Sequence, residues 1–163
     1  MKEVLPDIFV TVGFHTGFLR LVRKIDELAP KLGAKVVMQI GNSSYQPKNT
    51  EFFRFAPSLH NYINKADLVI SHGAMTVIEA IRASKPVIIV PRQARYGEHI
   101  NDHQVEFSET LETHPAVEVV HDVNRLEVAI QQISRKFIVV KFDDSNRIRL
   151  VRALREFVRA CGR

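Results

Sequence analysis

The residues with the clearest binding chemistry form a turn near the middle of the chain, HGAMT at residues 72–76. Its glycine permits an unusual backbone angle, and its threonine hydroxyl follows in what we expect to be the first turn of a helix. Backbone N–H groups and the helix dipole at such a place favour a diphosphate without the help of a metal. Glu79 follows three residues after Thr76. Its carboxylate could accept hydrogen bonds from both hydroxyls of a ribose, or it could be a capping-box or surface residue.

A second turn of this kind follows the apolar run DIFVTVG at residues 7–13. Gly13 would allow close backbone approach, and His15 and Thr16 supply hydrogen-bond donors. The pattern is neither G-x-G-x-x-G nor a P-loop, so those two phosphate-binding motifs are excluded. His15 could contact a ligand or could be a solvent-exposed loop histidine.

A third polar segment is EHINDHQ at residues 98–104. We expect it at the mouth of the same sheet edge, where it could hydrogen-bond a polyhydroxylated group. His99 and His103 lie four apart on an expected helix, a spacing that also suits a metal ion. No third ligand is apparent, so we favour the first interpretation and expect no metal.

Strands and helices must alternate to place these turns together. Apolar runs without alternation are typical of strands buried on both faces of a parallel sheet. The resulting prediction is an α/β fold, a Rossmann-like open, mainly parallel sheet with helices on both faces. We expect strands at 7–13, 34–40, 51–56, 68–70, 87–90 and 116–120, and helices at 18–32, 58–65, 76–83, 99–111 and 122–134. Ser58 and Asp122 are the expected N-caps of two of these helices, and residues 135–144 could be a strand or a linking loop.

The composition indicates one soluble domain spanning residues 1–163. No apolar run approaches the roughly 20 residues of a membrane helix, and the first residues do not resemble a signal peptide, so we expect a cytoplasmic location. Cys161 is the only cysteine, which agrees with a reducing compartment. Much of the net charge of +5 lies in an expected basic amphipathic helix at about 145–160. That helix could dock on the sheet, or it could contact a membrane surface or a partner.

Several motifs, in a consistent order and spacing, resemble the C-terminal domain of the family-28 glycosyltransferases. They are FVTVG from Phe9, QIGNSSYQP, FFRFAPSL, ADLVISHG and NDHQ at residues 101–104. The resemblance extends to stand-alone donor-binding subunits of bipartite transferases, such as those of asparagine-linked glycosylation and of bacterial exopolysaccharide synthesis. It covers most of the chain and fades after about Val120.

This resemblance implies the half of a GT-B fold that binds a nucleotide sugar. By position, the loop Gly13–Thr16 would face the diphosphate and sugar, Phe55 and Ala56 the uracil, and Asp102 with Gln104 the sugar hydroxyls. The central turn would hold the phosphates and Glu79 the ribose. The implied substrate-binding residues are Gly13, Thr16, Phe55, Ala56, His72, Gly73, Ala74, Met75, Thr76, Glu79, Asp102 and Gln104, and the implied catalytic base is His15.

The function implied is an inverting transfer of a hexose or N-acetylhexosamine from a UDP-sugar to a lipid-linked acceptor. It would need no metal cofactor, but it would need a membrane-anchored partner subunit that binds the acceptor and recruits the chain to the cytoplasmic membrane face. The alternative is a non-enzymatic UDP-sugar-binding or regulatory module, because the turn at 72–76 is one residue shorter than the family's and has Met75 in place of a glycine. Nucleic-acid binding is disfavoured, since no aromatic residues interleave with the basic ones.

Overall fold

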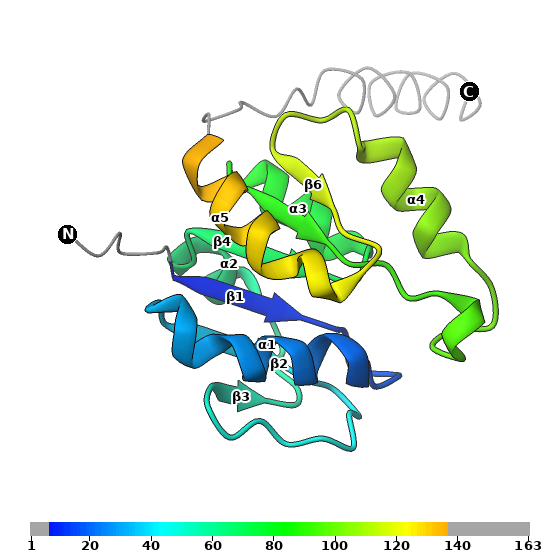
Figure 1. Ribbon diagram of the computed structural model, residues 1–163, viewed down its shortest axis with the longest axis horizontal. Helices are drawn as coiled ribbons and strands as arrows, with labels where there is room; N and C mark the ends of the chain where they lie inside the picture. Colours follow the sequence, from blue (N-terminus) through cyan, green and yellow to red (C-terminus); the bar gives the residue numbers. More distant parts are fainter. Residues whose placement is uncertain (1–6, 137–163) are drawn as a thin grey trace, which may run out of the picture.

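Six parallel strands form one open sheet in the computed structural model, which describes residues 7–136 (Figure 1). The strands lie in the order β3-β2-β1-β4-β5-β6, and every neighbouring pair is parallel. The predicted Rossmann-like α/β class is therefore confirmed. The strands are β1 Ile8–Thr11, β2 Val36–Gln39, β3 Glu51–Phe53, β4 Leu68–Ser71, β5 Val87–Ile89 and β6 Val117–Val119.

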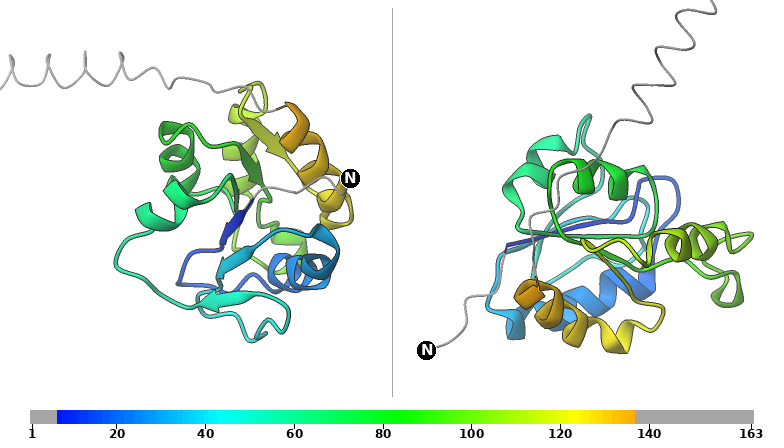
Figure 2. Two further views of the ribbon diagram at one scale, coloured as in Figure 1. Left: turned by 90° about the vertical axis from the view of Figure 1, so that its left-hand side faces the viewer. Right: turned by 90° about the horizontal axis from the view of Figure 1, so that it is seen from above.

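Helices cover both faces of the sheet (Figure 2). The helices α1 (Leu19–Leu32) and α5 (Leu126–Lys136) share one apolar core with the sheet. The helices α2 (His60–Lys65), α3 (Met75–Arg82) and α4 (His103–Leu111) contribute to the core on the other face. Two short 3-10 helices, η1 (Ala94–Tyr96) and η2 (Val123–Arg125), precede α4 and α5.

Local sequence explains why the central elements form. All four residues of β1 are buried, as are all four of β4, which is why these runs show no alternation of apolar and polar side chains. In α1 the buried side chains recur at the spacing of one helix face, and the helix ends at Gly33, whose φ of 62° is left-handed. The helix end predicted at residue 32 is confirmed.

The direction of the connections changes between β1 and β4, which lie side by side with Thr11 opposite Ser71. The chain runs outward from β1 through β2 to β3, and then returns to β4 and continues outward through β5 to β6. Loops that leave β1 and β4 therefore diverge, and open parallel sheets bind ligands in the crevice at such a point.

The main difference from the sequence prediction concerns the helix expected at 99–111. It begins only at His103, because the chain first forms η1 and then passes through Gly97, whose φ of 67° interrupts a right-handed helix. The helical spacing expected for His99 and His103 is therefore wrong.

The N-cap predicted at Ser58 is wrong, because the N-cap of α2 is Leu59, whereas the cap predicted at Asp122 takes a modified form. The helix expected from Ser58 begins at His60, and the Ser58 hydroxyl accepts a hydrogen bond from the His60 N–H (3.3 Å). Asp122 accepts from the Asn124 N–H (2.9 Å) and caps the 3-10 turn that leads into α5. The basic helix expected at 145–160 and Cys161 lie outside the described residues. Within residues 7–136, none of the helices has the length and apolar character needed to span a membrane.

Candidate functional site

A cavity of about 750 Å³ lies at the point where the loops leaving β1 and β4 diverge. This volume falls within the range typical of small-molecule sites. Its walls come from the loop after β1, the segment between β3 and α2, and the turn that opens α3. The lining residues are Thr11, Gly13, Phe14, His15, Gln39, Phe55, Ala56, Pro57, Ser58, Leu59, His60, His72, Ala74, Met75, Thr76 and Glu79.

Most of the residues singled out in the sequence meet at this cavity, although they come from three separate connections. Those that line it are Gly13, His15, Phe55, Ala56, His72, Ala74, Met75, Thr76 and Glu79. Thr16, Gly73, Asp102 and Gln104 are not among the lining residues. The individual roles of all these residues remain predictions.

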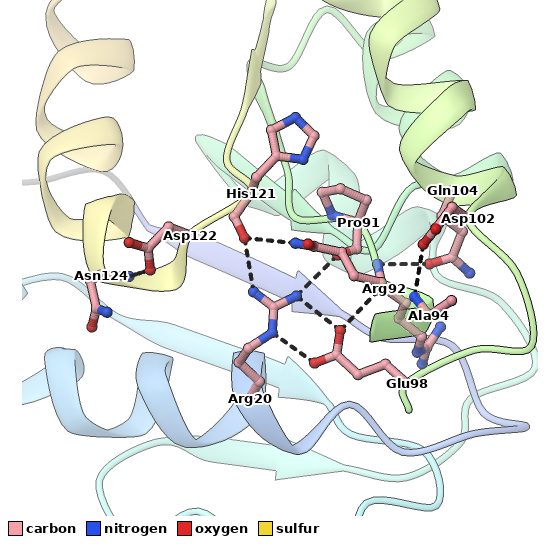
Figure 3. A network of polar contacts seen from close by, with 11 residues as sticks. Arg20, Pro91, Arg92, Ala94, Glu98, Asp102, Gln104, His121, Asp122 and Asn124 are labelled. Atoms are coloured by element: carbon pink, nitrogen blue, oxygen red, sulfur yellow. Dashed lines mark hydrogen bonds and ion pairs between the residues drawn. The ribbon is translucent and has the colours of Figure 1, made fainter. Parts of the chain in front are cut away.

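Asp102 and Gln104 hold the polar loop after β5 against the start of α4 (Figure 3). Asp102 accepts a hydrogen bond from the Ala94 N–H (2.7 Å), and the Gln104 amide oxygen accepts one from the Arg92 N–H (3.1 Å). The second carboxylate oxygen of Asp102 and the amide nitrogen of Gln104 take no part in these two bonds, but neither residue lines the cavity.

The helix α3 presents an uncapped N-terminus to the cavity. Its N-cap is Ala74 in an extended conformation, no side chain caps it, and its first turn has no acidic residue. The capping-box alternative for Glu79 is therefore wrong, because the helix begins at Met75 and Thr76 is not its N-cap. The free N–H groups and the positive end of the helix dipole make this end of the cavity suitable for an anion.

His72 forms a neutral wall of the cavity. Its side chain is 7% exposed, and its Nδ1 lies 3.3 Å from the carbonyl oxygen of Thr11. Burial, and secondly the positive charge of Arg92, lower the pKa of His72 to about 4. The imidazole is thus neutral at pH 7, and because a carbonyl only accepts, Nδ1 carries the proton and Nε2 a lone pair.

Aromatic side chains stand at the rim of the cavity. Phe14 and Phe55 are exposed and meet edge to face, with their ring centroids 5.7 Å apart. The His15 ring lies next to that of Phe14, with a centroid distance of 3.9 Å. The sequence analysis included Phe14 in the loop Gly13–Thr16 but assigned no role to its ring.

The sequence analysis gave no role to Arg20, which joins α1 to the connections after β5 and β6 at the carboxyl edge of the sheet (Figure 3). Its Nε and Nη2 contact the two carboxylate oxygens of Glu98 at 2.7 and 2.9 Å. Its guanidinium also donates to the carbonyl oxygens of Pro91 and His121, each at 3.1 Å. Glu98 in turn accepts from the Gln93 N–H (3.0 Å). No sequence signal could have found this junction, because Arg20 and Glu98 are 78 residues apart.

Two further features of the described residues lie outside this cavity. His99 and His103 do lie together, with ring centroids 4.4 Å apart, but no group of three or more potential metal ligands occurs in residues 7–136. A smaller cavity of about 280 Å³ lies at the amino ends of β1, β2 and β3, beside Lys35, Glu51 and Lys65. Neither feature is part of the cavity at β1 and β4.

Curated proteins with similar sequences are glycosyltransferases. Human UDP-N-acetylglucosamine transferase subunit ALG13 is 34% identical over 121 residues, which cover 64% of this chain and 10% of that protein. The zeaxanthin glucosyltransferase of Pseudescherichia vulneris is 34% identical over 96 residues, covering 53% of this chain and 23% of that protein. The chain thus spans between about a tenth and a quarter of the length of these relatives.

Glycosyltransferases are among the solved structures with a similar fold. The kitacinnamycin glycotransferase superposes with a TM-score of 0.61 at 19% identity, covering 82% of this chain and 36% of that one. The spinosyn rhamnosyltransferase SpnG gives a TM-score of 0.58 at 17% identity, covering 95% and 46%. At these identities the likeness shows the shared fold alone, in which this chain corresponds to less than half of the larger enzyme. Residues 7–140 match the glycosyltransferase family 28 C-terminal domain, and the chain belongs to that family.

Proposed function

We propose that this chain is the donor-binding and catalytic subunit of an inverting glycosyltransferase. It moves a hexose or N-acetylhexosamine from a UDP-sugar to a lipid-linked acceptor. The observation that carries the proposal is the cavity between β1 and β4, where His15, Glu79 and the uncapped start of α3 come together. Membership of the family and the names of the curated relatives support the same class of reaction.

The proposed reaction uses the groups at the cavity in one displacement. The acceptor hydroxyl oxygen attacks the anomeric carbon, and the bond from that carbon to the UDP oxygen breaks. UDP leaves with the bonding electron pair, and its charge is stabilised by the N-terminus of α3. His15 takes the proton of the attacking hydroxyl. The charge of the leaving group is thus met by backbone N–H groups, and the proposal requires no metal.

The acceptor side of the reaction is assigned to a partner. The similar enzymes of known structure are more than twice as long as the region that matches this chain, and one curated relative is named as a subunit. We assign the acceptor-binding half to a membrane-anchored partner, which recruits this cytoplasmic chain to the membrane face. The exposed rim residues Phe14 and Phe55 would then lie between the two halves.

A non-enzymatic UDP-sugar-binding or regulatory module is the second candidate. Met75 favours it, because its side chain is 69% exposed at the cavity, where the family's turn has a glycine. A side chain at this place reduces the room in front of the α3 N-terminus. Binding of UDP without sugar transfer would be the property of such a module.

Calorimetry with UDP tests the nucleotide site. The wild-type chain should bind UDP, and Glu79→Ala should weaken binding about 10-fold or more, since the loss of a carboxylate acceptor leaves ribose hydroxyls unpaired. The affinity for 2′,3′-dideoxy-UDP should be the same in both proteins, because that ligand lacks both hydroxyls. The matched control is Glu51→Ala, which removes an exposed carboxylate outside the cavity between β1 and β4. Equal affinity of wild type and Glu79→Ala for UDP would refute the ribose assignment, and a wild-type chain that binds no UDP would refute the proposed function.

Reconstitution tests the transfer itself. The chain should be co-expressed with the product of a neighbouring gene that encodes a membrane-anchored protein, and sugar transfer to lipid extracts should be measured. Transfer is expected only when both proteins are present, and the product should have the inverted anomeric configuration. Intact UDP binding with no transfer would favour the module.

A further inference from the structure

The loop that carries His15 is held mainly by side chains from other segments. Within the loop Gly13–Thr16, the Gly13 N–H has only a long contact to the Thr11 hydroxyl (3.5 Å). The amide group of Asn42 donates to the His15 carbonyl oxygen (3.1 Å). The Val12 N–H donates to the carbonyl oxygen of Gln39 (3.2 Å), and the carbonyl oxygens of Val12 and Thr16 accept hydrogen bonds from Arg92. The position of the His15 ring over the cavity therefore depends on residues far away in the sequence.

Arg92 lies behind this loop, at the carboxyl end of β5. Its Nη2 donates to the carbonyl oxygens of Val12 (2.6 Å) and Thr16 (2.8 Å), the residues at the two ends of the loop. Its backbone N–H donates to Gln104, and its guanidinium lies 5.0 Å from the centre of the Phe18 ring. One side chain thus joins the loop after β1 to the loop after β5.

The burial of the Arg92 guanidinium destabilises the folded state. Arg92 is 2% exposed, its Nε has no hydrogen-bond partner, and it forms no ion pair with a carboxylate in residues 7–136. Burial lowers its pKa to about 10 although the negative charge of Glu98 acts in the opposite direction, so Arg92 remains charged at neutral pH. A buried cation without a carboxylate partner destabilises a fold compared with an apolar side chain of similar size. Stability alone therefore does not explain an arginine at this position, and such groups are typical of functional sites.

We propose that Arg92 is a positioning residue for sugar transfer, whose guanidinium closes the base of the loop Gly13–Thr16 and fixes His15 at the cavity. Arg92 itself does not line the cavity, so it acts through the loop and not on the substrate. The role in transfer rests on the proposed function, whereas the effect of Arg92 on the loop does not.

Hydrogen exchange of the loop amides tests the structural part without any assay of function. In Arg92→Met, the amides of Val12 and Gly13 at the start of the loop should exchange about 10-fold faster or more, because their hydrogen bonds to the Gln39 carbonyl oxygen (3.2 Å) and the Thr11 hydroxyl (3.5 Å) open more often, while the amides of β1 keep their wild-type rates. Arg92→Lys keeps the charge, but its single nitrogen does not reproduce the planar geometry, so an intermediate rate is expected. Arg95→Met, an exposed arginine in the same connection, should leave the loop amides unchanged. Wild-type exchange in both Arg92 variants would overturn the proposal.

Kinetics with the partner present tests the functional part. In Arg92→Met, kcat should fall about 30-fold or more while the Kd for UDP changes less than about 3-fold, because a misplaced base affects the chemical step and not the nucleotide. Arg92→Lys should recover part of kcat. Faster loop exchange with unchanged kcat would show a purely structural role and overturn the assignment.

If Arg92→Met does not fold, Arg92→Lys decides both tests. A wild-type chain that neither binds UDP nor transfers sugar would refute the proposed function instead, and the exchange experiment would still stand.

Discussion

His72 is a buried titratable group at the cavity, and its neutral state has consequences for the whole fold. The imidazole touches the backbone of Thr11 on β1 and lies beneath Gly13, where an added Cβ would be 3.3 Å from His72 Cε1. Arg92, His99 and His103 all disfavour a positive charge on His72. Protonation of this ring would therefore oppose folding.

His72 should make the protein less stable in acid. Its pKa in the folded state, about 4, is below the ordinary value of 6.5, so the unfolded chain binds more protons between these values and stability falls as pH drops below 6.5. We expect the free energy of unfolding to lose about 2 kcal/mol from this residue between pH 7 and pH 5.

Urea unfolding at the two pH values measures this effect. The His72→Gln variant cannot titrate at this position, so its loss of stability on acidification should be smaller than that of the wild type by about this 2 kcal/mol. His60→Gln changes a histidine for which no ring contact to the backbone is seen, and it should retain the wild-type loss. An equal loss of stability on acidification in the wild type and in His72→Gln would contradict the assignment of this loss to His72.

Residue types near strand ends were predictable, whereas their supporting contacts were not. His15, His72 and Glu79 could be selected from the sequence because each follows an apolar run closely enough to reach the same sheet edge. Arg20 and Arg92 could not, because their partners are distant in the sequence and an arginine among polar residues has no periodicity. Burial of a charge is a property of the folded chain only.

At the scale of elements, the loops after β1 and β2 touch backbone to backbone. A Cβ on Gly41 would lie 2.2 Å from the Gly13 carbonyl oxygen and 2.8 Å from Phe14 Cα, and Gly41 has a φ of 51°. These loops therefore support each other only while residue 41 has no side chain. The sequence prediction placed both strands correctly but contained no information on this contact.

Gly41→Ala should destabilise the protein by about 3 kcal/mol, from the left-handed backbone and from the steric clash with Gly13 and Phe14. Gly33→Ala is the matched control, because Gly33 has a similar φ of 62° and no atom within 4 Å of the added Cβ. It should cost about 1–2 kcal/mol. Urea denaturation measures the free energy of unfolding of both variants, and the difference between their losses is the contribution of the steric clash. Similar losses in the two variants would show that the loops can separate at no cost in free energy.

Element boundaries were less predictable than the elements themselves. The start of α4 was placed too early because residues 98–102 are polar and helix-compatible, and the left-handed Gly97 and the short η1 turn were not recognised. Central strands were easier, because burial on both faces leaves an unmistakable apolar run. The alternation of strands and helices predicted a mainly parallel sheet. It did not predict the order in which the strands lie in that sheet.

At the scale of the molecule, the cavity couples ligand binding to the stability of the whole sheet. Its walls derive from the connections after β1, β3 and β4, so unfolding of the sheet would destroy it. A ligand that binds only the folded state stabilises that state by mass action.

UDP at about 100 times its Kd should therefore raise the free energy of unfolding by about 2.7 kcal/mol. Thermal or urea unfolding with and without UDP measures this, and Glu79→Ala at the same UDP concentration should show a smaller gain. Free uridine at the same concentration should stabilise less, because it offers no diphosphate to the N-terminus of α3. An unchanged midpoint with UDP would contradict nucleotide binding at the cavity.

The separation of cavity walls from the two apolar cores makes this domain well suited to protein engineering. The cores are built from strand residues and from the inward faces of the helices, whereas Phe55 and Met75 at the cavity are exposed. Residues 55–58 and 74–76, none of which is buried, can therefore be exchanged as cassettes, or randomised in a library, with little repacking of the interior. Selection among such libraries is a direct route to variants with altered ligand preference on an unchanged scaffold.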